Sequence, residues 1–351
     1  MDRLQQEIIP ICKVFDQYEK KTEEIALFIQ TAEEQKDFVE TVEVNPKTEA
    51  FVAGLRKLSN SVVLYNAAII SIYGSYEMFL DEALKSYLVY LKKWNKLYAE
   101  FPERLRKKHI SKSAEFLSNP QRFLNMGLSN EDVIIALEAS YVKGQSAPLL
   151  DDLLLSHSGN LNTKQLNEQL KEYGFENPIH KLLKHTPFKD LCIGNRPIEI
   201  EGGTVFPILD QLVDERNKVG HGWIAENRLS FSLLRERYLP FVIGLCDAVK
   251  DLIVSKIIQD YIDSNFIKQF DPIIHVWKNG EIIGVNSKSF RLKVGEQLYY
   301  STDDDWNYPF LIVNLQNDRQ DRKEIRAVNK DITIQTDRKM KENYTIWGYT
   351  R

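Results

Sequence analysis

The stretch at residues 204–223, TVFPILDQLVDERNKVGHGW, combines a helical pattern with side chains that can do chemistry. Its apolar residues recur at the three- and four-residue intervals of one helix face; they are Ile208, Leu209, Leu212, Val213 and Val219. The charged residues are expected mostly on the other faces; they are Asp210, Asp214, Glu215 and Lys218. The stretch therefore predicts a helix with one side in the core and polar groups near its C-terminal end.

Arg216 and His221 stand five positions apart, with Asn217 directly after the arginine. Positions five apart on a helix are rotated by roughly 140° from alignment, so a straight helix would not aim both at one small target. Gly220 and Gly222 flank the histidine and can loosen or end the helix. Either a local bend or an interface between two protomers would bring the two groups together.

The two side chains suit the cleavage of a phosphodiester. Arginine is a permanent cation whose fork matches a phosphate. Histidine gives and takes a proton near neutral pH. Together they supply what is needed to break RNA without a metal, with the ribose 2′-hydroxyl as nucleophile.

The same spacing occurs once more, at Arg104 and His109 in ERLRKKH. This second match lies in a basic run after Pro102 and lacks the following Asn and Gly. Runs of like charge are usually solvated. We therefore expect this segment to be a solvated face and not a site.

Three segments resemble the HEPN superfamily of ribonucleases, and within it the branch of larger prokaryotic, defence-associated proteins. They are LYNAAIISIYGSYEMFLDEALKSYL at 64–88, SHSGNLNTKQLNEQLKEYGF at 156–175 and ERNKVGHGW at 215–223. The resemblance spans about residues 64–262. It implies a helical fold in which two protomers place their motifs side by side, and hence a homodimer.

The resemblance also implies roles for individual residues. His221 would transfer protons, Arg216 would stabilise charge developing on the phosphate, and Asn217 would hold the phosphate or the histidine. Glu77, on the early helix, would orient Arg216 or His221; its other interpretation is a partly buried ion-pair partner, because a buried carboxylate needs a cation. An enzyme of this kind would be a toxin or antiphage effector, restrained by an antitoxin or regulatory partner.

Composition sets broad limits. The chain has 351 residues, a net charge of −4 and 43% hydrophobic residues, which suits one large domain with a small one and does not suit a protein that coats nucleic acid. Cys12, Cys192 and Cys246 are far apart, which predicts reduced thiols in a cytoplasmic protein. No membrane span, signal peptide or cofactor is expected.

Helical periodicity dominates up to about residue 264. We expect a helix or helical hairpin at 1–41, a break at 42–48, and a helix whose 61–91 interval is apolar on more than one face. Short helices are expected at 103–109, 131–142 and 162–173, within an irregular stretch at about 101–200. A long helix is expected at 233–263, with a kink at Pro240.

The irregular stretch also holds His157, His180 and His185, whose spacing matches no metal site, so core or surface histidines are expected and no metal. The polar segment 157–164, HSGNLNTK, is expected to be a loop and helix cap. Contact of this segment with a substrate is the alternative.

From residue 271 the sequence alternates between apolar and polar positions. Lys278-Asn279-Gly280-Glu281 predicts a hairpin, and five or six short strands predict a small antiparallel barrel or sandwich. The aromatic residues of this region are expected in the core, with a stacking platform for nucleic acid as the alternative; they are Trp277, Tyr299, Tyr300, Trp306 and Trp347.

The combined prediction is a mainly α protein with a HEPN-like antiparallel helical bundle at 1–264 and an all-β domain at 270–351. Its expected function is metal-independent endoribonuclease activity on RNA. One competing hypothesis is a catalytically silent HEPN-like module that dimerises and binds RNA or a protein. A weaker one is a metal-dependent nuclease or nucleotidyltransferase, for which the sequence offers only Asp303–Asp305, expected to be a loop.

Overall fold

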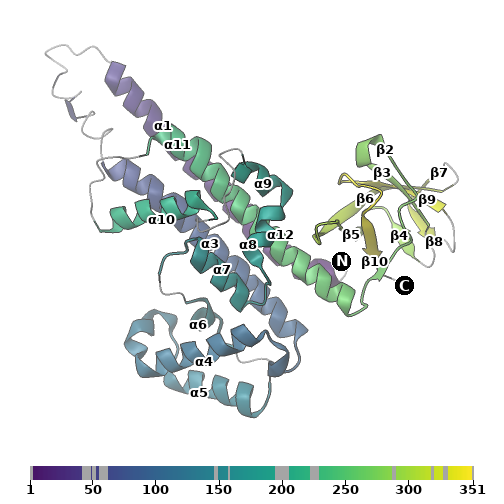
Figure 1. Cartoon of the computed structure of the whole chain (residues 1–351), viewed down its shortest axis with the longest axis horizontal. Helices are drawn as coiled ribbons and strands as arrows, with labels where there is room; N and C mark the ends of the chain where they lie inside the picture. The colour runs from purple at the N-terminus through teal and green to yellow at the C-terminus, as the bar shows by residue number, and fades with distance from the viewer. Residues whose placement is uncertain are drawn as a thin grey trace. The chain divides into compact units, whose positions relative to one another are not determined.

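The computed structural model describes residues 3–41, 49, 53–54, 62–145, 149–156, 159–193, 205–221, 229–286, 290–317, 320–326 and 331–349. Within these residues the chain is helical up to Asp263 and forms antiparallel strands from Lys268 onward (Figure 1). The predicted class, a mainly α protein with a small C-terminal antiparallel β domain, is confirmed. Close packing defines two compact units: one is Cys12–Val249, and the other is Met1–Ile11 with Lys250–Arg351.

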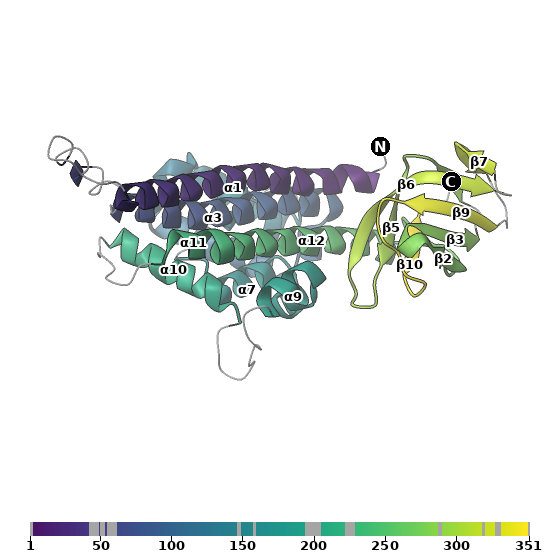
Figure 2. The same cartoon turned by 90° about the horizontal axis from the view of Figure 1, so that it is seen from above.

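Long helices form the core of the Cys12–Val249 unit. They are α1 (Arg3–Thr41) from Cys12 on, α3 (Val62–Trp94), and the run from α11 (Phe231–Leu233) into α12 (Leu239–Asp263) up to Val249. They lie alongside one another, with α1 antiparallel to α3 (Figure 2). Aromatic rings of α1 pack on α3. The ring centroids of Phe15 and Tyr18 lie 6.0 and 5.1 Å, respectively, from the ring centroid of Phe79. As predicted, α3 buries more than one face; its buried residues include Tyr65, Ile69, Tyr73, Tyr76, Leu80 and Leu84.

Just before Pro240, where a kink is predicted, the helix contains a π turn, η4 (Leu234–Tyr238), between α11 and α12. Proline has no N–H to donate within a helix, so its preceding turn loses a hydrogen bond. A single wide turn is a common way for a helix to absorb such a defect. The helix then continues to Asp263.

Short helices fill residues 103–193, and those predicted from sequence are present. They are α4 (Glu103–Ser118), α5 (Asn130–Leu137), α6 (Asp151–Leu155), α7 (Thr163–Glu172), α8 (Pro178–Lys184) and α9 (Thr186–Ile193). Side-chain caps set two of their starts, at Ser129 for α5 and at Asn162 for α7. Phe116, Phe123 and Val133 pack with Leu153 into a small core under this region.

None of the helices in the described ranges is long and apolar enough to cross a membrane. No disulfide joins the three cysteines, which all lie in the described ranges, and Cys246 is buried.

His109 corrects the expectation of a solvated basic face. It is fully buried on α4, whose inner side is formed by Leu105, His109, Ser113 and Phe116. The hydroxyl of Tyr98 lies 3.1 Å from its Nδ1. The neighbouring Arg104 is exposed and pairs with Glu168 at 3.3 Å. The second Arg–His match is therefore a solvated cation beside a core histidine, because helical spacing turns the two residues to different sides.

The burial of His109 predicts a pH dependence of stability. Burial, and the nearby charge of Lys92, lower the pKa of His109 to about 4, from about 6.5 in an unfolded chain. The unfolded chain binds a proton that the folded one does not, so stability falls as pH falls from about 6.5 to about 4, by on the order of 3 kcal/mol. When the free energy of unfolding is measured with urea at several pH values, the His109→Gln variant should lack the part of the decrease at low pH that is due to His109. Identical pH dependence in both proteins would contradict the assignment.

The C-terminal strands form a curled antiparallel sheet. They are β1 (Lys268–Gln269), β2 (His275–Trp277), β3 (Ile282–Asn286), β4 (Arg291–Lys293), β5 (Gln297–Ser301), β6 (Asn307–Asn317), β7 (Gln320–Arg322), β8 (Glu324–Arg326), β9 (Asp331–Thr336) and β10 (Thr345–Gly348). The main sheet runs β1-β10-β5-β6-β9-β3-β2, with β7 beside β6 and a separate β4-β8 pair. The barrel or sandwich expected from sequence is thus a half-barrel.

The predicted hairpin joins β2 to β3 through Lys278–Gly280, with φ of 48° and 55° at Lys278 and Asn279. Gly280 has φ +98°, and a Cβ there would lie 2.8 Å from the carbonyl oxygen of Met340. Only glycine fits this turn without a shift of the backbone. The sequence signal for the hairpin is therefore confirmed.

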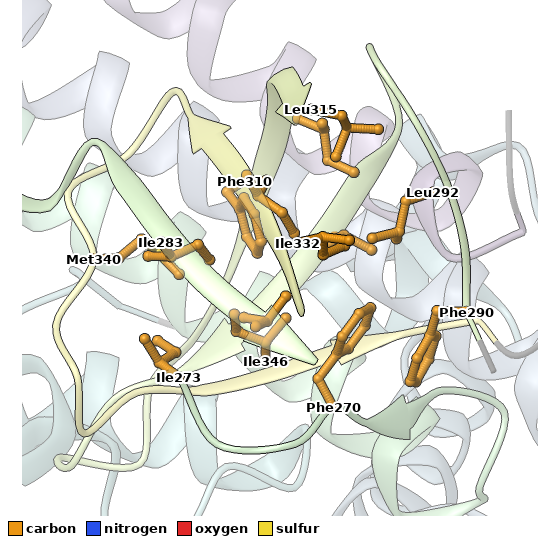
Figure 3. Close-up of a cluster of buried hydrophobic side chains, with 14 of the residues drawn as sticks. Phe270, Ile273, Ile283, Phe290, Leu292, Phe310, Leu315, Ile332, Met340 and Ile346 are labelled. Carbon is orange, nitrogen blue, oxygen red and sulfur yellow. The ribbon is translucent and has the colours of Figure 1, made fainter. Parts of the chain in front are cut away.

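Apolar side chains of the strands fill the inside of the curl (Figure 3). Ile283 faces Ile334, and Leu315 faces Ile334 from the other side. Two residues of α12, Ser255 and Gln259, accept hydrogen bonds from Asn307 at the start of β6. The backbone N–H of Asn307 donates to Ser255 Oγ at 2.9 Å, and its side-chain amide donates to Gln259 Oε1 at 3.0 Å. The last turns of α12 therefore belong with the strands.

The aromatic residues of this unit divide between core and surface. Tyr299, Tyr300 and Trp306 are buried, as expected. Trp347 is half-buried, and its Nε1 donates to Ser301 Oγ at 2.8 Å. Trp277 differs, because 43% of its surface is exposed.

Candidate active site

Helix α10 (Pro207–Gly220) is the predicted motif helix, and it packs on α3. Pro207 occupies its first turn, where a missing N–H costs no helical bond. Its inner side buries Ile208, Leu209, Leu212 and Val213, as the apolar spacing predicts. The last turn carries Arg216 and Asn217, and His221 is the C-cap residue.

Glu215 is buried, at 3% exposure, and not on an outer face as the sequence suggested. The hydroxyl of Tyr65 on α3 donates to its Oε2 at 2.6 Å, and Lys218 Nζ lies 2.7 Å from its Oε1. These partners satisfy a carboxylate that burial would otherwise penalise. The bond from Tyr65 also fastens the C-terminal half of α10 to α3, directly beside Arg216.

Arg216 lies against an aromatic ring of α3. Its Cζ is 5.3 Å from the centroid of Tyr73, within the range of a cation–π contact. Its Nη1 donates to Asn217 Oδ1 at 3.4 Å. These two contacts position the half-buried guanidinium without neutralising its charge, as a phosphate-binding group requires.

Tyr73 connects Arg216 to Glu77. Its hydroxyl donates to Glu77 Oε1 at 2.6 Å and accepts the N–H of Leu161 at 2.8 Å. Burial, followed by the hydrogen bond to Glu77, raises the pKa of Tyr73, so the hydroxyl stays protonated. Glu77 is thus bonded to the tyrosine whose ring lies against Arg216.

The polar segment Asn160–Thr163 runs along α10. Asn160 Nδ2 lies 2.5 Å from Asn217 Oδ1, and the N–H of Thr163 donates to Asp210 Oδ1 at 2.8 Å. Asn162 caps α7, as expected. The segment therefore serves as a helix cap and also contacts a candidate site residue.

His221 is exposed at the end of α10. Its N–H donates to the carbonyl of Asn217 at 3.0 Å, so the helical bonding pattern extends to the histidine. On such a helix Asn217 and His221, four positions apart, share a face, whereas Arg216 and His221 diverge by roughly 140°. A bend that would bring Arg216 and His221 together in one protomer is not present at this point. Gly222 lies outside the described residues.

The sequence alone does not single out Tyr73 or Asn160. Both contact α10 from segments distant in the chain. Of these two residues, Tyr73 alone had a local sequence signal, because it stands one helical turn before Glu77. Glu215 did have a signal, because it stands seven positions after the buried Ile208 and three after the buried Leu212.

The other histidines and acids of interest lie elsewhere. His157 is outside the described residues, His180 is exposed, and His185 is buried within 4.8 Å of Asp247. His185 and Asp247 both carry atoms that bind metals. Asp303–Asp305 form the turn between β5 and β6, as expected.

The family model of the RiboL-PSP-HEPN family matches residues 16–255, which is well over half of the chain. The protein is therefore a HEPN protein and belongs to the RiboL-PSP-HEPN family. No curated protein and no solved structure matches the chain. Membership in this family points to a function on RNA, by cleavage or by binding.

Proposed function

We propose that the protein is a metal-independent endoribonuclease whose catalytic groups are Arg216, Asn217 and His221. The observation that carries this proposal is the cation of Arg216, held against Tyr73 one residue from Asn217, on a helix that ends in the exposed His221. A cation, an amide and an imidazole on one helix end are what phosphodiester cleavage through the 2′-hydroxyl needs.

A homodimer completes the site in this proposal. Arg216 and His221 diverge around α10, so one protomer does not focus both on a single phosphate. A two-fold axis beside the helix ends would pair the motifs of two protomers, and two-fold pairing is the commonest symmetry of protein assemblies. The dimer would then offer two imidazoles and two guanidinium groups to one RNA strand.

The mechanism follows from these groups. One His221 accepts the proton of the 2′-hydroxyl, whose oxygen attacks the adjacent phosphorus. The other His221 protonates the leaving 5′-oxygen, and Arg216 stabilises the charge on the phosphate, with Asn217 holding the phosphate or the histidine. The products are a 2′,3′-cyclic phosphate and a free 5′-hydroxyl.

Such an activity harms the cell that makes it. The proposal therefore extends to a cytoplasmic toxin or antiphage effector of the prokaryotic defence branch, restrained by an antitoxin or another regulatory partner. The support for this extension is the resemblance of the three segments to that branch.

The test is incubation of purified protein with total RNA in the presence of EDTA, beside the Arg216→Ala, His221→Ala double variant. The wild type should cut and the double variant should not. A strict requirement for Mg²⁺ or Mn²⁺ would favour a metal-dependent nuclease, for which His185 and Asp247 are the donors to examine. Binding of RNA without cleavage under any condition would favour a silent binding module.

A further inference from the structure

A pocket of about 570 Å³ lies next to the candidate site, along the same helix. Asp210, in its lining, stands seven positions before Asn217, so the two share a face of α10 and are separated by roughly 10 Å along its axis. The segment Asn160–Thr163 contacts both residues, because Asn160 bonds to Asn217 and Thr163 bonds to Asp210. The pocket and the candidate site thus lie on the same polar face of α10, beside the same segment of the chain.

The lining of the pocket mixes an acid, an amide and a cation with an apolar side chain. These residues are Asp210, Asn167, Lys164 and Ile179. One oxygen of Asp210 accepts the Thr163 N–H, and within the described ranges its second oxygen has no donor. A carboxylate repels phosphate but accepts the amino groups on base edges. The ring of a base could pack on Ile179, as unstacked RNA bases do on protein side chains.

We propose that this pocket holds a nucleobase flanking the cut phosphate, and that Asp210 selects a base with an exocyclic amino group over uracil. Uracil presents two carbonyl oxygens around its single N–H, and these would face the carboxylate. This inference rests on the proposed ribonuclease function. It adds to that function a sequence preference that the catalytic groups do not supply.

The experiment maps the cut positions in total RNA for the wild type and for Asp210→Asn. The wild type should disfavour uracil at one flanking position by about tenfold or more, and Asp210→Asn should remove that preference. The asparagine keeps a carbonyl to accept the Thr163 N–H. Asp214→Asn makes the same charge change at an exposed position of α10, one turn away, and should keep the wild-type preference.

The possible outcomes distinguish a failure of the base-pocket assignment from a failure of the proposed ribonuclease function. Cutting by the wild type with no base preference, or a preference unchanged in Asp210→Asn, overturns the pocket assignment and leaves the ribonuclease standing. Absence of any cutting by the wild type overturns both. If Asp210→Asn does not fold, Asn167→Ala, which leaves the Asp210–Thr163 bond in place, should weaken the preference, and an unchanged preference overturns the assignment.

Discussion

Replacement of His221 by alanine should lower the rate of RNA cleavage by about 10²- to 10⁴-fold, the usual contribution of a proton-transferring side chain. Stability should hardly change, because the side chain is exposed and the N–H that caps α10 through Asn217 is retained. The measurement is single-turnover cleavage of a labelled RNA, with circular dichroism and sedimentation to verify fold and assembly.

A matched control is His275→Ala. His275 is an exposed histidine in the β-strand unit, paired with Glu342 at 3.2 Å. Its removal should leave cleavage at the wild-type rate. His109 would be a poor control, because its side chain is buried and its loss would destabilise α4. If the His221→Ala variant cleaves RNA at the wild-type rate, His221 is not the proton-transfer group.

A second effect, which tests the dimer itself, is expected when wild-type and His221→Ala chains are co-expressed and allowed to form mixed dimers. If one cleavage event uses a histidine from each protomer, mixed dimers are inactive, and activity follows the square of the wild-type fraction. An equal mixture should then keep about a quarter of the wild-type activity, and a nine-fold excess of variant about one hundredth.

Independent protomers give a different result. An equal mixture would then keep about half of the activity and a nine-fold excess about a tenth. Exchange between the two chain types can be verified with two affinity tags. Activity proportional to the wild-type fraction would show that each protomer has a complete site, and would require another explanation for the divergence of Arg216 and His221 on α10.

Features with local causes could be predicted from the sequence. The inner face of α10 follows from apolar spacing, the start of α7 from the cap at Asn162, and the β2–β3 hairpin from Asn279-Gly280. Each depends on residues within one or two turns of one another. Periodicity and turn chemistry report such neighbours directly.

The supports of the candidate site could not be predicted in the same way. The contacts of Tyr73 with Arg216 and of Asn160 with Asn217 join residues 143 and 57 positions apart. Their existence depends on the packing of α3 and the 160–163 segment on α10, which no local pattern specifies. His109 shows the converse: its basic neighbours suggested solvent, but its own helical position turned it into the core.

The most direct test of internal attack on the phosphate uses an RNA oligonucleotide with a single cut site, in EDTA, and its copy with one 2′-deoxy nucleotide on the 5′ side of that site. The all-ribose strand should be cut to a 2′,3′-cyclic phosphate and a 5′-hydroxyl, and the deoxy copy should stay intact at that position. Cleavage of the deoxy copy at the same phosphate would contradict the account, because the nucleophile would then have to come from outside the RNA.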